Sequence, residues 1–249
     1  MINVGQELAV QSYCFRHFKD NAVCADMVRQ CGLTNIELCG VHVNFADAAA
    51  CDRALAAYKK AGVRVVSIGV NGLKGDESAE RPYFEFLKKA GARHMSVDFA
   101  VDSVPGSYRL AERLAQEYGV RLGIHNHGGR HWLGPASMLA HVFATTNDRI
   151  GLCLDTAWAL DSGEDPVALA EKFAKRLYAL HLKDFVFDKA RKPKDVVVGT
   201  GNLDLAKLHA VLKKADFGGL AVLEYEGDVE DPVPAVTECV KAVRRAMKG

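Results

Sequence analysis

The sequence lacks the features that mark several broad classes of protein. Among its 249 residues, 32 Lys and Arg balance 31 Asp and Glu, and the formal net charge is +1. This balance gives no electrostatic reason to expect nucleic acid or a membrane surface as a partner. No uncharged apolar run approaches the roughly 20 residues that span a bilayer, and the amino terminus shows no secretion signal. We therefore expect neither a membrane span nor nucleic-acid binding.

Cysteine pairs and glycine-rich phosphate loops are also missing. Seven cysteines are scattered along the chain, and none forms a C-x-x-C pair that would indicate a zinc knuckle or a redox motif. Several lie in apolar segments, where a free cysteine behaves as a small hydrophobe, so we expect a reducing, cytoplasmic compartment. No G-x-G-x-x-G turn follows the first predicted strand, which argues against dinucleotide binding. No Pro- or Ser-rich linker divides the chain, so we expect a single domain over 1–249.

What the sequence does contain is a regular alternation of β-rich and amphipathic segments. Helical patterns such as 47–62 place apolar residues three and four positions apart. Eight strands within about 250 residues predict a (β/α)8 TIM barrel of the α/β class, with an open doubly wound sheet as the rival. The predicted strands cover 8–15, 35–41, 64–70, 94–99, 121–127, 150–156, 177–185 and 219–226.

Helix boundaries are marked by glycine and by Asp-Pro pairs. Four glycines follow helical runs and are expected to end them: Gly32, Gly62, Gly91 and Gly119. Two Asp-Pro pairs suit helix starts, with Asp as the N-cap: Asp165 with Pro166, and Asp231 with Pro232. Gly199 and Gly201 are expected to form a turn before a helix that begins near Asp204.

The carboxyl ends of the predicted strands are unusually polar, and in such barrels these ends carry the catalytic groups. Three histidines gather within seven positions at strand five, in "LGIHNHGGRHWLG" over 122–134. Mixed carboxylate and imidazole ligands suit one divalent cation such as Mn²⁺, Co²⁺, Zn²⁺ or Mg²⁺. The polar residues at these ends are Glu37, His125, Asn126, His127, Asp155, His181, Lys183, Asp184, Glu224 and Glu226.

The runs "NIEL", "IGLCLDT", "LHLKDF", "VVVGTGNLDL" and "AVLEYEGD", in this order, resemble the sugar phosphate isomerase/epimerase family of xylose-isomerase-like barrels. The resemblance covers essentially the whole chain. It implies a metal held by residues of strands five to eight, of which Asp155, His181 and Glu224 match three. Where the family commonly has Glu at the end of strand five, this sequence has His125. Either His125 is the fourth ligand, or His127 takes that place and His125 acts as a base.

Further residues are candidates for catalysis or substrate binding. Lys183 is expected to be a general acid or an electrostatic partner of a developing oxyanion, unless it forms a salt bridge with a neighbouring carboxylate. Glu37 is expected to hydrogen-bond a sugar hydroxyl or to orient His125. Trp132, Trp158 and His131 are candidate substrate contacts, against packing for the tryptophans and an ordinary loop position for His131. The basic run 188–194 is either an anion site or a solvated loop.

The predicted function is that of a divalent-metal-dependent isomerase or epimerase acting on a sugar or sugar phosphate. A proton is removed next to a carbonyl by Glu224 or a strand-five histidine, and the metal stabilises the enediolate. The family's epimerases use two ligand glutamates as bases on opposite faces of the sugar. Because His125 replaces the first of them, a lyase or dehydratase is the alternative.

Two other classes remain open. A DNA-repair enzyme of the endonuclease IV type would need a multi-metal cluster and a histidine where this chain has Trp158. A sugar-binding relative without catalysis would keep the aromatic residues and bind no metal. The expected partner is a small carbohydrate, and barrels of this kind frequently form homo-oligomers.

Overall fold

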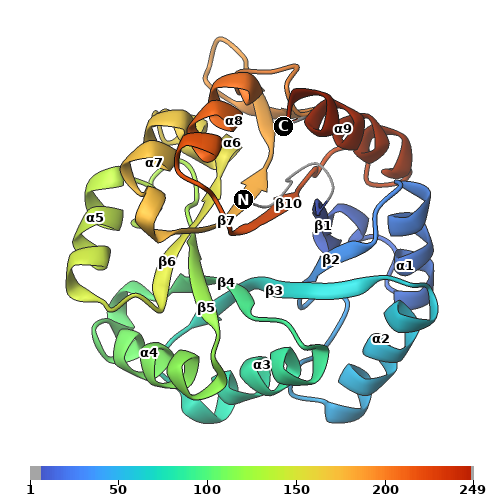
Figure 1. Cartoon of the computed structure of the whole chain (residues 1–249), viewed down its shortest axis with the longest axis vertical. Helices are drawn as coiled ribbons and strands as arrows, with labels where there is room; N and C mark the ends of the chain where they lie inside the picture. The colour runs from blue at the N-terminus through green and yellow to red at the C-terminus, as the bar shows by residue number, and fades with distance from the viewer. Residues whose placement is uncertain (1–6, 248–249) are drawn as a thin grey trace.

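A computed structural model describes residues 7–247, in which eight parallel strands form a closed barrel with helices between the strands (Figure 1). The predicted TIM barrel is therefore confirmed, and each of the eight predicted strands has a counterpart. The barrel strands are β1 (Ala9–Gln11), β2 (Asn35–Leu38), β3 (Arg64–Leu73), β4 (His94–Phe99), β5 (Arg121–His125), β6 (Ile150–Asp155), β7 (Leu177–Leu182) and β10 (Leu220–Leu223).

Helices ring the strands on the outside of the barrel (Figure 1). The α-helices are α1 (Asn21–Gln30), α2 (Ala48–Lys60), α3 (Glu77–Ala90), α4 (Gly106–Tyr118), α5 (Ala136–Thr145), α6 (Thr156–Asp161), α7 (Pro166–Lys172), α8 (Leu205–Lys214) and α9 (Val233–Ala246). Within the part of the chain that the structure describes, three short 3₁₀ helices accompany them: η1 (Ser12–Phe15), η2 (Val101–Ser103) and η3 (Ala174–Arg176).

The predicted helix ends are confirmed except at the start of α9. Gly32, Gly62, Gly91 and Gly119 all have positive φ angles between 67° and 74°, the left-handed conformation that suits glycine after a helix. At α7, the side chain of Asp165 accepts a hydrogen bond from the Val167 N–H at 2.8 Å.

The expected cap of α9 is wrong, because Pro232 rather than Asp231 is the N-cap. The first helical bond runs from the Val236 N–H to the carbonyl of Pro232, at 2.9 Å. Asp231 belongs to the preceding turn, where its N–H donates to the carbonyl of Asp228.

The predicted strand 177–185 is also wrong in its last residues. Strand β7 ends at Leu182, and a separate hairpin follows, in which β8 (Asp184–Phe187) pairs antiparallel with β9 (Pro193–Val196). The break falls at Lys183, whose N–H bonds to the hydroxyl of Thr156 at 3.0 Å instead of continuing the barrel. The basic run 188–194 forms the turn of this hairpin and the start of β9.

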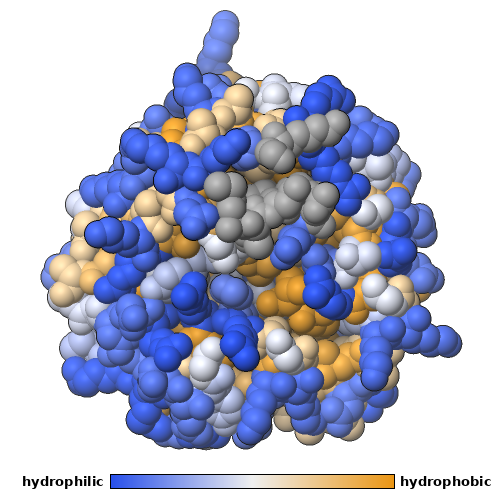
Figure 2. Space-filling view, viewed as in Figure 1, coloured by the Kyte–Doolittle hydropathy of each residue, from blue (hydrophilic) through white to orange (hydrophobic). Residues whose placement is uncertain are grey.

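The barrel strands are buried on both faces, as parallel strands between helices and a barrel interior must be. Every residue of β6 and of β7 is buried. On the face seen in Figure 2, hydrophilic residues cover most of the outer margin, whereas apolar residues show through toward the centre. All seven cysteines lie within the described residues and are buried and unpaired. Within residues 7–247, no helix has the length and apolar character needed to cross a membrane.

A buried carboxylate fixes the loop that follows β9 beside the barrel. Asp184 accepts four backbone N–H bonds of 2.8–3.0 Å, from Gly199, Gly201, Asn202 and Leu203. A Cβ atom at position 201 would lie 2.6 Å from Oδ1 of Asp184, so the close approach requires glycine there. The predicted turn at Gly199 and Gly201 is confirmed, and Asp204 is the N-cap of α8.

Candidate metal centre and active-site cavity

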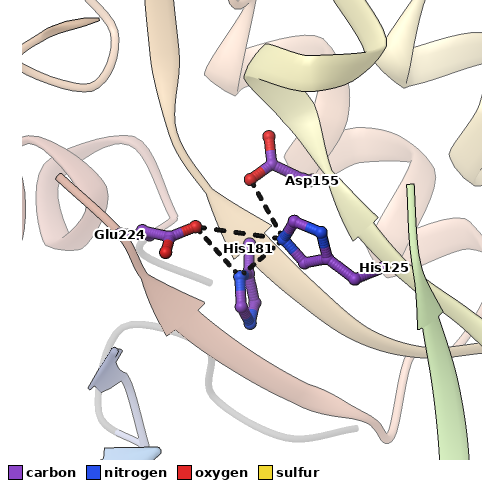
Figure 3. Close-up of side chains that lie close together, drawn as sticks. All are labelled: His125, Asp155, His181 and Glu224. Atoms are coloured by element: carbon purple, nitrogen blue, oxygen red, sulfur yellow. Dashed lines mark hydrogen bonds and ion pairs between the residues drawn. The ribbon is translucent and has the colours of Figure 1, made fainter. Parts of the chain in front are cut away.

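Four polar side chains from four neighbouring strands converge at the carboxyl end of the barrel (Figure 3). His125 ends β5, Asp155 ends β6, His181 lies in β7, and Glu224 directly follows β10. Nε2 of His125 lies 3.1 Å from Nδ1 of His181 and 3.4 Å from Oδ2 of Asp155. Oε2 of Glu224 lies 3.2 Å from Nδ1 of His181 and 3.9 Å from Nε2 of His125.

The geometry of this group suits a cation. Each of the four residues offers one ligand atom, and these atoms lie within 4.8 Å of one another. Oδ1 of Asp155 caps α6 by accepting the Trp158 N–H at 2.8 Å, whereas Oδ2 is buried and accepts no hydrogen bond from the described residues. A buried carboxylate oxygen without a partner is costly, and a divalent ion would satisfy it. The role of these residues as metal ligands stays a prediction.

The electrostatics of the group also favour positive charge at its centre. Burial would lower the pKa of His125, but the nearby carboxylates of Asp155 and Glu224 raise that pKa above its ordinary value. Burial would raise the pKa of Glu224, but Lys183 and the two imidazoles hold that pKa well below its usual range. Closely packed carboxylates around neutral imidazole nitrogens are a typical divalent cation site.

Glu37 lies beneath this group and contacts a different imidazole from the expected one. Its carboxylate is fully buried, and Oε1 accepts a hydrogen bond from Nε2 of His181 at 2.8 Å. Ser96 and Gln11 donate to the same carboxylate at 2.8 and 2.7 Å. The expectation that Glu37 orients His125 is therefore wrong, because the side chain points into the barrel interior where Nε2 of His181 lies.

Lys183 is completely buried and surrounded by carboxylates. Its Nζ atom forms an ion pair with Glu226 and lies 3.9 Å from both Glu224 and Asp195. Burial would lower the pKa of Lys183, but Glu224, Asp155 and the other acids raise it well above the usual range. Burial raises the pKa of Asp195 to about 7. The salt bridge with a neighbouring carboxylate that was considered from the sequence is therefore present, and the Lys183 ammonium lies against the carboxylates of Glu226 and Glu224.

A cavity of about 440 Å³ opens above the four-residue group. Its lining includes His125, His127, Trp158, Glu224 and Glu226, together with Gln11 and Tyr13 from the first strand and η1. Two larger hollows, of about 600 and 570 Å³, lie at the amino ends of the strands. Because ligands of parallel barrels bind at the carboxyl ends, and because His125 and Glu224 line the smaller cavity, that cavity is the candidate active site.

The remaining strand-five candidates divide between the cavity and its border. His127 and Trp158 line the cavity. His131 lies beside Asp98, with Nε2 3.5 Å from Oδ2. Trp132 packs against the hydrophobic core and donates its indole N–H to the carbonyl of Phe99 at 3.1 Å. Its position in the structure is that of a packed side chain, so we do not propose Trp132 as a substrate contact.

Two residues of the site, Gln11 and Asp195, were not singled out from the sequence. Gln11 interrupts the apolar run of β1, and this polar residue inside a buried strand is the signal that could have identified it. Asp195 belongs to β9, and nothing in the sequence placed it beside Lys183 because the hairpin was not predicted. Asn126, which was named from the sequence among the polar strand ends, bonds to both the N–H and the carbonyl of Asp155, at 2.8 and 2.9 Å, and so fixes the end of β6.

Comparison with known proteins agrees with this architecture. Residues 25–246 match the model of a family described as the xylose isomerase-like TIM barrel. The chain belongs to the xylose isomerase-like TIM barrel family. The resemblance to sugar phosphate isomerases and epimerases is thereby confirmed, and homologues in this family include dehydratases as well as epimerases.

Among the relatives, the rhizopine catabolism protein MocC of Rhizobium meliloti is 29% identical over 85% of this chain and 76% of its own length. The inosose dehydratase of Geobacillus kaustophilus is 30% identical over 50% of this chain and 45% of its own length. This second alignment thus spans less than half of that relative. A solved sugar phosphate isomerase/epimerase from Parabacteroides distasonis is 17% identical, with a TM-score of 0.70 over 97% of this chain and 94% of that one, a likeness that concerns the fold.

Proposed function

We propose that this protein is a divalent-metal-dependent enzyme that removes a proton next to the carbonyl of a polyhydroxylated substrate and then eliminates water. The observation that carries the proposal is the convergence of His125, Asp155, His181 and Glu224 beside the active-site cavity. A cation such as Mn²⁺, Co²⁺, Zn²⁺ or Mg²⁺ held there would supply Lewis acidity that polarises a substrate carbonyl.

Proton removal is assigned to the carboxylate of Glu224. This residue lines the cavity, and Lys183 and the two imidazoles keep its pKa low, so the carboxylate is ionised at neutral pH. His125 faces the other three ligands, which leaves His127 as the strand-five residue directed at a substrate hydroxyl. Burial lowers the pKa of His127 to about 3, so its imidazole is neutral and can both donate and accept a hydrogen bond.

Lys183 acts through the acids that it contacts. Its ammonium is completely buried, forms an ion pair with Glu226, and lies 3.9 Å from Glu224. The fixed positive charge at this position lowers the pKa of Glu224 and so holds that carboxylate ionised. We therefore assign Lys183 as a positioning residue and as an electrostatic partner of the negative charge that develops on the substrate.

The asymmetry of the site favours elimination over epimerisation. Epimerisation needs an acid–base group on each face of the sugar, and Glu224 supplies one of them. On the opposite side, strand five presents His125, which is engaged with His181 and Asp155. Elimination needs only one base and a group that assists the departing hydroxyl, and relatives named inosose dehydratase support this choice. Isomerisation or epimerisation remains the second candidate, because the sequence motifs resemble sugar phosphate isomerases and epimerases.

One incubation separates the two reactions. Protein loaded with Mn²⁺ is mixed in deuterated water with an inosose and, separately, with a panel of ketoses, and the products are followed by NMR and mass spectrometry. Loss of one water from the inosose supports the dehydratase. Deuterium next to the carbonyl without loss of any group identifies an isomerase or epimerase, and neither water loss nor exchange with any carbonyl substrate contradicts both.

The matched variants are Glu224→Gln, which removes the proposed base, and Glu230→Gln, which changes an exposed carboxylate of the loop before α9. We expect Glu224→Gln to abolish both water loss and exchange, and Glu230→Gln to leave the wild-type reaction unchanged. Equal exchange in both variants would contradict the role assigned to Glu224.

A further inference from the structure

A second group of ligand-type side chains lies beside the active-site cavity, at the carboxyl ends of β4 and β5. Asp98 comes from β4, His127 from the residues after β5, and His131 from the loop that leads to α5. Each offers one ligand atom, and these atoms lie within 4.8 Å of one another. We call these three residues the outer triad. We propose that the outer triad binds a second divalent cation, of the imidazole-preferring class that includes Zn²⁺ and Co²⁺.

The carboxylate of Asp98 is held in the orientation that a ligand needs. Oδ1 accepts the Phe99 N–H at 2.9 Å, which leaves Oδ2 directed toward Nε2 of His131. These two atoms lie 3.5 Å apart, too far for a strong hydrogen bond. Ligand atoms about 2.1 Å from a tetrahedral zinc ion lie about 3.4 Å from one another. The separation of Oδ2 and Nε2 is therefore that of two ligands of one ion.

His127 supplies a ring nitrogen that lacks a partner. Its Nδ1 atom is buried and makes no hydrogen bond within residues 7–247. Its ring lies between the rings of His125 and His131 and is tilted against both. The ring centroid of His127 is 4.7 Å from that of His125 and 4.8 Å from that of His131. A buried imidazole without a hydrogen-bond partner is unfavourable in an apolar setting, and a cation would satisfy it.

The loop that carries His131 is fixed by contacts of its own. The His131 N–H bonds to the carbonyl of Gly128, and the Gly134 N–H bonds to the carbonyl of His131, at 3.2 and 3.0 Å. Trp132 ties the loop to the end of β4 through its indole bond to Phe99. These contacts hold His131 beside Asp98 before any ion arrives, which lowers the entropy lost on binding.

Cation binding by the outer triad would break one hydrogen bond of His131. Its Nδ1 atom accepts the Leu133 N–H at 3.3 Å, so the proton of the neutral ring lies on Nε2. Coordination through Nε2 moves that proton to Nδ1 and gives up the Leu133 contact, which is already long. A weak hydrogen bond is thus exchanged for a metal–nitrogen bond.

The class of cation follows from the donors and their exposure. Two imidazoles and one carboxylate favour zinc-like ions over Mg²⁺ or Ca²⁺, which prefer oxygen. The side chains of Asp98 and His131 are each 29% exposed, so the fourth position faces solvent at the border of the cavity. Three protein ligands with an open position are typical of a reactive rather than a structural zinc site.

Cobalt stoichiometry tests the proposal without reference to enzymatic activity. Protein stripped of metal by a chelator is titrated with Co²⁺, and the bound ion is counted by elemental analysis after gel filtration and followed by its visible absorption. We expect two Co²⁺ per chain in the wild type. Asp98→Asn and His131→Gln should each bind one Co²⁺. Asp155→Asn, which alters the inner group of His125, Asp155, His181 and Glu224, should also bind one.

The matched controls are Asp102→Asn and His141→Gln, which change exposed residues of η2 and α5 and should keep two ions. A wild-type protein that saturates at one Co²⁺ overturns the outer site, whether or not the inner site and the proposed reaction stand. A second ion that both Asp98→Asn and His131→Gln retain is an adventitious surface ion and also overturns the proposal.

Discussion

Oε1 of Glu37 lies 2.8 Å from Nε2 of His181, and this bond determines which nitrogen of the imidazole remains for a ligand. With the proton on Nε2, the lone pair is on Nδ1, which faces Glu224 at 3.2 Å. Burial would raise the pKa of Glu37, but His181, Ser67 and Ser96 bring that pKa below its ordinary value, so the carboxylate stays an acceptor. A residue of β2 thereby orients a candidate ligand of β7 across the barrel interior.

Replacement of Glu37 by Gln should weaken cation binding at the inner group. The amide can present an N–H to Nε2 of His181 and so favour the tautomer with the proton on Nδ1. We expect the dissociation constant for Mn²⁺ to rise about 10- to 100-fold, the effect typical of losing a residue that orients a metal ligand. Isothermal titration calorimetry measures this dissociation constant.

Ser96→Ala, which removes another hydrogen bond to Glu37 and leaves the His181 bond in place, serves as the control. Equal affinities of wild type and Glu37→Gln would refute the orienting role.

Replacement of Lys183 by Met should destabilise the protein at pH 7. The variant leaves Glu226, Glu224 and Asp195 near one another without their buried cation. Breaking a buried ion pair by removing one partner costs about 3–5 kcal/mol of unfolding free energy. Urea unfolding of the metal-free protein measures the loss, with Lys189→Met in the exposed hairpin turn as the control. A loss no greater than that of the control would show that the carboxylates do not depend on Lys183.

His94 should make stability depend on pH at the opposite end of the barrel. Burial, together with the charge of Arg121, lowers the pKa of His94 to about 4, so the folded protein keeps a neutral ring while the unfolded chain takes up a proton near pH 6.5. The unfolding free energy therefore keeps its full value above pH 6.5. It decreases as the pH falls toward 4, because only the unfolded chain binds the proton in that range. At pH 5 the loss is about 2 kcal/mol. Urea unfolding at pH 7.5 and pH 5 should show a smaller decrease for His94→Gln than for wild type, and equal decreases would contradict the assignment.

The repeated pattern of the chain was sufficient to predict the barrel. Apolar strands and glycine-terminated helices are local features, and their order along the sequence determines a parallel barrel once each helix must pack between two strands. The convergence of His125, Asp155, His181 and Glu224 also follows from this order, because each stands at the carboxyl end of its strand. These parts of the structure follow from the order of the strands and helices together with the polar residues at the strand ends.

The contacts inside the site depend on features that periodicity does not carry. The partner of Glu37 is set by the depth of its side chain in the barrel, and the sequence does not distinguish His181 from His125 on that ground. Asp195 reaches Lys183 through a hairpin whose first strand reads as a continuation of β7. Asp98 meets His131 only because the loop after β5 turns back across the end of β4. The paths of the loops and the depth of side chains inside the barrel could not be predicted from the sequence.

The central claim is that the four strand-end residues hold one cation. The most direct test compares Mn²⁺ binding by the wild type and by Asp155→Asn. The asparagine keeps an oxygen for the Trp158 N–H and replaces Oδ2, which faces Nε2 of His125 at 3.4 Å, by an uncharged amide nitrogen that is a poor cation ligand. Free Mn²⁺ is followed by electron paramagnetic resonance during titration, with the exposed Asp148→Asn as control. The account predicts tight binding by wild type and by the control, and an affinity about 100-fold lower for Asp155→Asn. An unchanged Mn²⁺ affinity in Asp155→Asn would contradict it.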